Sequence, residues 1–175
     1  SFTFFALAYY RLNNPKLFIF EPNSENFMYL KHNVAANAGE RNFYRLYHCA
    51  IGTYDGVAKL DTSKGNDAHR LSQNPKGTYE LCPVRTLQSV ATQEQVTRID
   101  ILKLDIEGGE YDLLDHKESF EFLKNHVVFI ILEYHVHNSL FNAQWIHARF
   151  HRDFDLIFER GEVMFWQNKR MRKKI

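Results

Sequence analysis

The sequence predicts an α/β fold in which most strands run parallel and a C-terminal hairpin adds antiparallel strands. The apolar runs Leu17–Phe20 and Val127–Glu133 have the continuous hydrophobicity of strands that are covered on both faces. Helical patterns alternate with such runs, which is typical of a parallel sheet with helices on both sides. With 175 residues, of which 45% are hydrophobic, we expect a single domain over residues 1–175.

Strand and helix patterns follow one another in the order that such a fold requires. The predicted strands are Leu17–Phe20, Phe43–Ala50, Val57–Leu60, Tyr79–Val84, Ile99–Leu104, Val127–Glu133 and the hairpin pair Phe154–Phe158 and Val163–Trp166. The predicted helices are Phe2–Leu12, a segment from Asn23 or Ser24 to Gly39, a segment from about Glu110, and Trp145–Phe150. Residues 61–77 are polar with little periodicity, which indicates an exposed loop.

The overall charge argues against nucleic acid as a partner. The 22 basic and 21 acidic residues leave a net charge of +1, so we expect no specific binding of nucleic acid. The basic run Lys169–Lys174 is the local exception, and it is explained either by a solvated terminus or by contact with phosphate or lipid headgroups.

The cysteine content and the hydropathy indicate in which cellular compartment the protein is expected. Cys49 and Cys82 are too few for a disulfide framework and lack C-x-x-C metal spacing. No run approaches the roughly 18 to 20 apolar residues of a membrane span. We therefore expect a cytoplasmic protein without a transmembrane segment.

Candidate site residues lie where predicted strands end, because ligands of parallel sheets bind at the carboxyl ends of strands. Glu21 follows the strand Leu17–Phe20, and a carboxylate there can accept hydrogen bonds from both hydroxyls of a ribose. A solvated acid before the turn at Pro22 explains Glu21 equally well on this evidence alone.

A cluster of acids follows the strand Ile99–Leu104. Asp105, Glu107 and Glu110 fall within six residues and repel one another unless a cation or helix N-terminal amides offset their charge. The plain alternative is capping, in which Asp105 or Glu107 caps the next helix and Glu110 lies in its first turn.

The chain resembles the FkbM family of methyltransferases at four sites in the family's order. The most specific match is the strand that ends in Lys103-Leu104-Asp105-Ile106-Glu107-Gly108-Gly109-Glu110, which is similar to the family phrase K-x-D-x-E-G-x-E. The others are Phe20-Glu21-Pro22-Asn23, Cys49-Ala50-Ile51-Gly52 and Ile131-Leu132-Glu133-Tyr134-His135.

This resemblance implies a Rossmann-like class I sheet and S-adenosyl-L-methionine (SAM) as cofactor. By resemblance, the cofactor-binding residues are Glu21, Pro22, Asn23, Cys49, Ala50 and Asp105. The implied reaction is O-methylation of a hydroxyl on a small molecule or sugar, with N-methylation left open. Such a transfer needs a base near the acceptor proton, and the candidate catalytic residues are Asp105, Glu107, Glu133 and His135.

Two other interpretations compete with this one, and a metal site is a separate possibility that the sequence does not favour. His135 and His137 can face one side of a strand, but two histidines without an assured third ligand favour no metal site. A non-catalytic Rossmann-like interaction domain would keep the fold of a methyltransferase without its activity. An NAD-dependent oxidoreductase would also place an acid on a ribose, although the K-x-D-x-E-G-x-E phrase argues against it.

The family pattern begins with a first strand and a D-x-G-A-N-x-G motif, neither of which occurs in the sequence. We therefore expect an N-terminally incomplete sheet. The two strands on either side of the missing one would lack a hydrogen-bonding neighbour. An additional segment, or a second copy of the chain as in a homodimer, would have to supply it.

Overall fold

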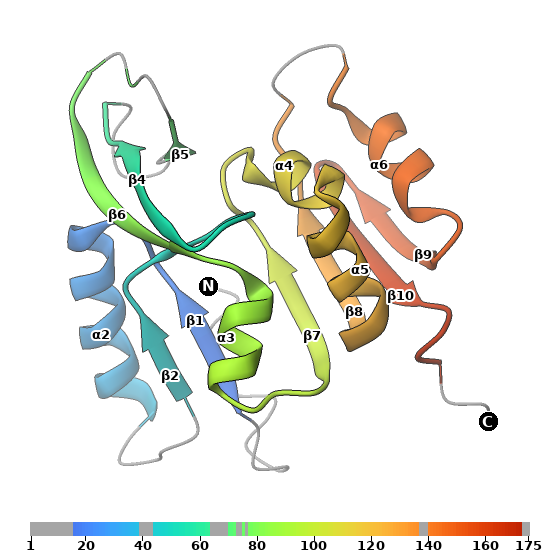
Figure 1. Ribbon diagram of the computed structural model, residues 1–175, viewed down its shortest axis with the longest axis horizontal. Helices are drawn as coiled ribbons and strands as arrows, with labels where there is room; N and C mark the ends of the chain where they lie inside the picture. The colour runs from blue at the N-terminus through green and yellow to red at the C-terminus, as the bar shows by residue number, and fades with distance from the viewer. Residues whose placement is uncertain are drawn as a thin grey trace. The chain divides into compact units, whose positions relative to one another are not determined.

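The computed structural model describes residues 16–38, 44–63, 70–72, 75, 77–136 and 140–172 (Figure 1). They form two compact units. Unit 1 comprises the described residues within Ser1–Ala50 and Val57–Val84, and unit 2 those within Ile51–Gly56 and Arg85–Ile175. The predicted helix Phe2–Leu12 lies outside the described residues. The single domain predicted over residues 1–175 stays a prediction.

Unit 1 contains a parallel strand pair joined by a helix. Strands β1 (Leu17–Phe20) and β2 (Tyr44–Tyr47) pair in parallel, with Leu17 opposite Tyr44, and α2 (Ser24–Ala38) lies between them in sequence. Asn23 caps α2, because its side-chain oxygen accepts a hydrogen bond from the Asn26 backbone N–H at 2.9 Å. This result selects Asn23 over Ser24 as the cap.

A second, four-stranded sheet has the order β3-β6-β4-β5 and lies mostly in unit 1. Its strands are β3 (Ala50–Ile51), β4 (Gly56–Asp61), β5 (Arg70–Leu71) and β6 (Tyr79–Arg85). Ala50, Leu60, Cys82 and Val84 form its core, and burial raises the pKa of the Cys82 thiol to about 11. Cys82 is therefore an uncharged core residue at neutral pH.

Two predicted segments differ in detail from the structure. The single strand expected over Phe43–Ala50 is interrupted at residues 48–49, so that β2 and β3 belong to different sheets. The loop expected over residues 61–77 contains the short strand β5, in which Leu71 pairs with Leu60 and is partly buried against the core. An apolar residue in a polar segment was the only sequence signal for β5.

Unit 2 is built on a four-stranded sheet of order β7-β8-β10-β9 (Figure 1). The strands are β7 (Ile99–Leu104), β8 (Val127–Glu133), β9 (Phe154–Arg160) and β10 (Val163–Asn168). β7 and β8 are parallel, with Leu104 opposite Leu132, whereas β10 runs antiparallel to both β8 and β9. The predicted C-terminal antiparallel hairpin is thereby confirmed, and Gly161 with φ 60° forms its turn.

Four helices belong to unit 2: α3 (Leu87–Gln93), α4 (Gly109–Asp115), α5 (Lys117–His126) and α6 (Ala143–Phe150). α4 and α5 connect the parallel strands β7 and β8, as a parallel pair requires. Phe120, Phe150, Phe154 and Trp166 pack together in the core with ring centroids 4.9–6.2 Å apart. The buried Asn168 amide donates to the Val127 carbonyl at 2.8 Å and so ties β10 to the start of β8.

The α/β class is confirmed, but the sheets are more mixed than predicted. The parallel pairs are β1–β2 and β7–β8, whereas β4–β5, β8–β10 and β9–β10 are antiparallel. One reason is that β10 follows β9 after a tight turn, and strands joined in this way must run in opposite directions. Among the described residues, no helix is both long and apolar enough to cross a membrane.

Candidate functional site

The site is built on a tight turn between β7 and α4. Glu107 and Gly108 are both in the left-handed region, with φ values of 52° and 96°. Gly108 meets this requirement without steric cost, whereas Glu107 is strained there. A strained residue after a strand needs surrounding contacts that hold it, and this one lies among charged side chains.

Glu110 supplies those contacts from the first turn of α4. Its side chain is fully buried, and its two oxygens accept hydrogen bonds from the backbone N–H groups of Ile106 and Gly108, each at 2.7 Å. The residue at the N-cap of α4 is Gly108, which has no capping side chain. The alternative in which Asp105 or Glu107 caps α4 therefore does not apply, although Glu110 lies in the first turn as that alternative required. Glu110 satisfies the amides of the turn instead.

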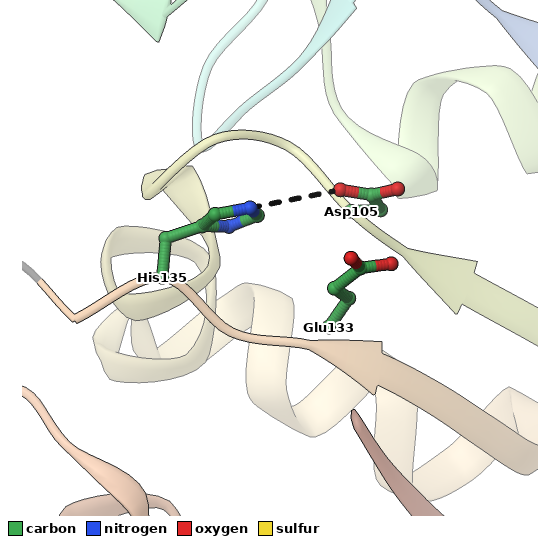
Figure 2. Close-up of side chains that lie close together, drawn as sticks. All are labelled: Asp105, Glu133 and His135. Atoms are coloured by element: carbon green, nitrogen blue, oxygen red, sulfur yellow. Dashed lines mark ion pairs between the residues drawn. The ribbon is translucent and has the colours of Figure 1, made fainter. Parts of the chain in front are cut away.

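His135 follows β8, the other strand of the parallel pair, and lies two residues after its end. Its Nδ1 lies 3.3 Å from Oε1 of Glu110, while its Nε2 lies 3.6 Å from Glu107 Oε2 and 4.0 Å from Asp105 Oδ1. Figure 2 shows His135 directed towards Asp105, with Glu133 beside them. The structure thus brings together all four predicted catalytic residues at the carboxyl ends of β7 and β8.

Lys103 is a fifth member of the cluster. Its ammonium lies 2.5 Å from Asp105 Oδ2 and 3.3 Å from Glu133 Oε2. Burial by itself lowers the pKa of Lys103, but the hydrogen bond and charge of Asp105, together with Glu133, outweigh burial and raise it. The ammonium therefore stays charged at neutral pH and links the ends of the two strands.

Three of these side chains also have the chemistry of metal ligands. Asp105, Glu133 and His135 each offer one ligand atom, and these atoms lie within 4.8 Å of one another. The positive charge between the two carboxylates is supplied here by Lys103. His137, the other histidine considered from the sequence, lies outside the described residues.

Burial and the neighbouring charges together shift the pKa of Glu107. Burial raises the pKa of its carboxyl group, His135 lowers it, and the neighbouring acids Asp105, Glu110 and Glu133 raise it further. The net shift is upwards. Ionised Glu107 is therefore disfavoured in the folded chain, and a positive charge placed near it would relieve this cost.

The residues assigned to cofactor binding in unit 1 gather at the ends of β1 and β2. The Glu21 N–H donates to the Tyr47 carbonyl at 3.1 Å, so the residues that follow the two strands meet at one edge. Glu21 Oε1 accepts the Asn23 N–H at 2.9 Å, and Pro22 lies in the turn between them. Cys49 and Ala50 are only 4% and 7% exposed, so they offer little surface to a ligand.

Lys103 and Glu110 belong to the site but were not among the site residues predicted from the sequence. Lys103 carried a detectable signal, because it is a charged residue near the end of an apolar strand and shares a strand face with Asp105. Glu110 belongs to the predicted acid cluster and to the K-x-D-x-E-G-x-E phrase, but no pattern indicates its burial, since an acid in the first turn of a helix is common on exposed surfaces. Only the structure shows that its side chain is completely buried.

Comparison with protein families identifies the chain. The model of the methyltransferase FkbM domain matches residues 1–164. The chain therefore belongs to the FkbM methyltransferase family, as the resemblance of its motifs predicted, and we describe it as a methyltransferase domain. Comparisons with curated proteins and with solved structures give no match.

The raised pKa of Glu107 predicts a pH-dependent cost in stability. The folded state binds a proton at Glu107 more readily than the unfolded state, so stability falls as pH rises from the unfolded pKa of about 4.3 through the folded pKa. The substitution Glu107→Gln removes this slope. It should raise the free energy of unfolding at pH 7 by roughly 0.2–1 kcal/mol, because the partly exposed carboxylate is screened by solvent.

Urea unfolding of the wild type and the variant between pH 4 and pH 8 measures this difference. Glu25→Gln is the matched control, because Glu25 is an exposed acid in the first turn of α2 and lies outside the cluster. A gain in stability at pH 7 that is equal in the two variants, or absent from Glu107→Gln, would contradict the account of the cluster.

Proposed function

We propose that this methyltransferase transfers the methyl group of SAM to a hydroxyl of a small molecule or sugar, with His135 as the general base. The observation that carries the proposal is the position of the His135 imidazole. Its Nδ1 meets a buried carboxylate, and its Nε2 faces the carboxyl end of β7, where an acceptor would be bound in a parallel sheet.

The residues of unit 1 fit the ribose of the cofactor. Glu21 directly follows β1, and its carboxylate is held by the hydrogen bond from the Asn23 N–H. A charged acceptor of this kind suits a vicinal diol. In unit 2, Asp105 is the residue proposed to face the methionine part. When bound, the cofactor supplies an electrophilic methyl group on a sulfonium.

The charges of unit 2 suit proton removal from a hydroxyl. Nε2 of His135 accepts the proton, and the carboxylates of Asp105 and Glu107, at 4.0 and 3.6 Å, stabilise the imidazolium that forms. The single positive charge of Lys103 lies between Asp105 and Glu133 and offsets part of the negative charge of the four acids in the cluster. Glu133 acts by holding Lys103 at the end of β7.

Cofactor binding is tested by calorimetric titration of SAM and of its demethylated product into the intact protein. We expect binding of both, a loss of at least about tenfold in affinity for Glu21→Ala through the lost charged hydrogen bonds, and no binding of NAD. Glu25→Ala is the matched control, because Glu25 is an exposed acid in the first turn of α2. Failure of the intact protein to bind SAM would reject the proposal and favour the interaction domain.

Methyl transfer is tested with labelled SAM against a panel of hydroxylated small molecules and sugars. For an accepted substrate, His135→Gln should lower kcat by roughly 10²- to 10⁴-fold, the usual contribution of a positioned base, without changing SAM affinity. His32→Gln, at an exposed position of α2, should retain the wild-type rate. A kcat of His135→Gln within twofold of the wild type would exclude His135 as the base.

A further inference from the structure

A buried carboxylate needs hydrogen-bond donors. Those of Glu110 are two backbone N–H groups of the turn after β7 and the imidazole of His135. Removing an ionised carboxylate from water is costly unless hydrogen bonds replace its hydration. Oε2 of Glu110 accepts the Gly108 N–H, and Oε1 accepts the Ile106 N–H, both at 2.7 Å. The same Oε1 lies 3.3 Å from Nδ1 of His135, which makes the imidazole the third partner of this carboxylate.

This arrangement determines which ring nitrogen of His135 carries the proton in the neutral form. An ionised carboxylate only accepts hydrogen bonds, so the bond between Nδ1 and Glu110 requires the proton to be on Nδ1. The carboxylates that face Nε2 lie farther away, at 3.6 Å for Glu107 and 4.0 Å for Asp105, beyond hydrogen-bond distance. Nε2 then has the free lone pair. The 3.3 Å separation is longer than an ideal hydrogen bond, as is common for catalytic contacts before substrate binds.

Acidic side chains face both nitrogens of the imidazole, but they differ in distance and burial. Asp105 and Glu107 face Nε2 from the turn after β7, Glu110 faces Nδ1 from α4, and Glu133 lies nearby at the end of β8. Lys103 lies against Asp105 and Glu133. Nδ1 thus meets the one fully buried acid, and Nε2 meets partly exposed acids near which an acceptor can approach.

We propose that Glu110 is a positioning residue for the methyl transfer: its buried carboxylate holds His135 in the Nδ1–H tautomer and presents Nε2 as the proton acceptor. The inference rests on the proposed function, in which His135 is the base. Glu110 touches neither reactant. It also holds the backbone of the turn that carries Glu107, so one side chain sets the geometry of both strand ends.

The direct test is the nitrogen NMR spectrum of the His135 imidazole, recorded on the intact protein labelled with ¹⁵N in histidine. At a pH where His135 is neutral, we expect Nδ1 to have the chemical shift of a protonated nitrogen and Nε2 that of an unprotonated one. His135→Gln assigns the signals by their loss. A wild-type spectrum dominated by the Nε2–H tautomer would overturn the inference, whatever the variants do.

The variant Glu110→Gln tests whether the Glu110 carboxylate is what holds His135 in the Nδ1–H tautomer. An amide can offer only one acceptor oxygen where the carboxylate offers two, so at least one of the three donors loses its partner. We expect the His135 signals to shift towards the Nε2–H tautomer. With an accepted substrate, kcat should fall by roughly 10²-fold or more and the pH profile of kcat/KM should move, at unchanged SAM affinity.

Asp112→Asn is the matched control, because Asp112 is an exposed acid in the first turn of the same helix. It should leave the tautomer, kcat and pH profile at their wild-type values. Retention of the Nδ1–H tautomer in folded Glu110→Gln would overturn the inference. If the Nδ1–H tautomer is found but no SAM binds, the positioning of His135 is supported and the proposed function is the part that fails.

Discussion

The site depends on one buried carboxylate. Glu110 accepts the amides of Ile106 and Gly108 on separate oxygens and meets the imidazole of His135 with one of them. Without these contacts the turn after β7 would leave two N–H groups unsatisfied and Glu107 strained without compensation. The positions of Asp105 and Glu107 relative to His135 follow from this carboxylate. Since β7 and β8 are adjacent and parallel, their carboxyl ends place the turn and the histidine side by side.

Much of the fold could be predicted from the sequence, because its strongest patterns come from buried strands. β1, β7 and β8 begin and end at the predicted residues, since their apolar runs are bounded by charged or turn residues. Strands with weaker hydrophobic patterns were harder to predict. β5 has two residues, and β3 is separated from β2 by a two-residue break that no hydrophobic pattern marks. The mixture of parallel and antiparallel pairing depends on contacts distant in sequence, which local patterns do not encode.

The candidate site could be predicted in part. The acids at strand ends were identifiable because parallel sheets place ligands there, and His135 was identifiable because it follows β8 by two residues. The charge of Lys103 in an apolar strand was visible in the sequence, but its ion pair with Glu133 of β8 depends on the pairing of the two strands. The burial of Glu110 could not be predicted. An acid in a helix's first turn is explained by the helix dipole alone, and its burial beneath a turn depends on the packing of α4.

The central claim, that the Glu110 carboxylate holds the turn after β7, is tested most directly by amide hydrogen exchange followed by NMR. The account predicts that the Ile106 and Gly108 N–H groups, although they lie in a turn, exchange as slowly as the hydrogen-bonded amides of α4. Exchange of both amides at the rate of unprotected peptide groups would contradict it, because the carboxylate would then not be bonded to the turn in solution.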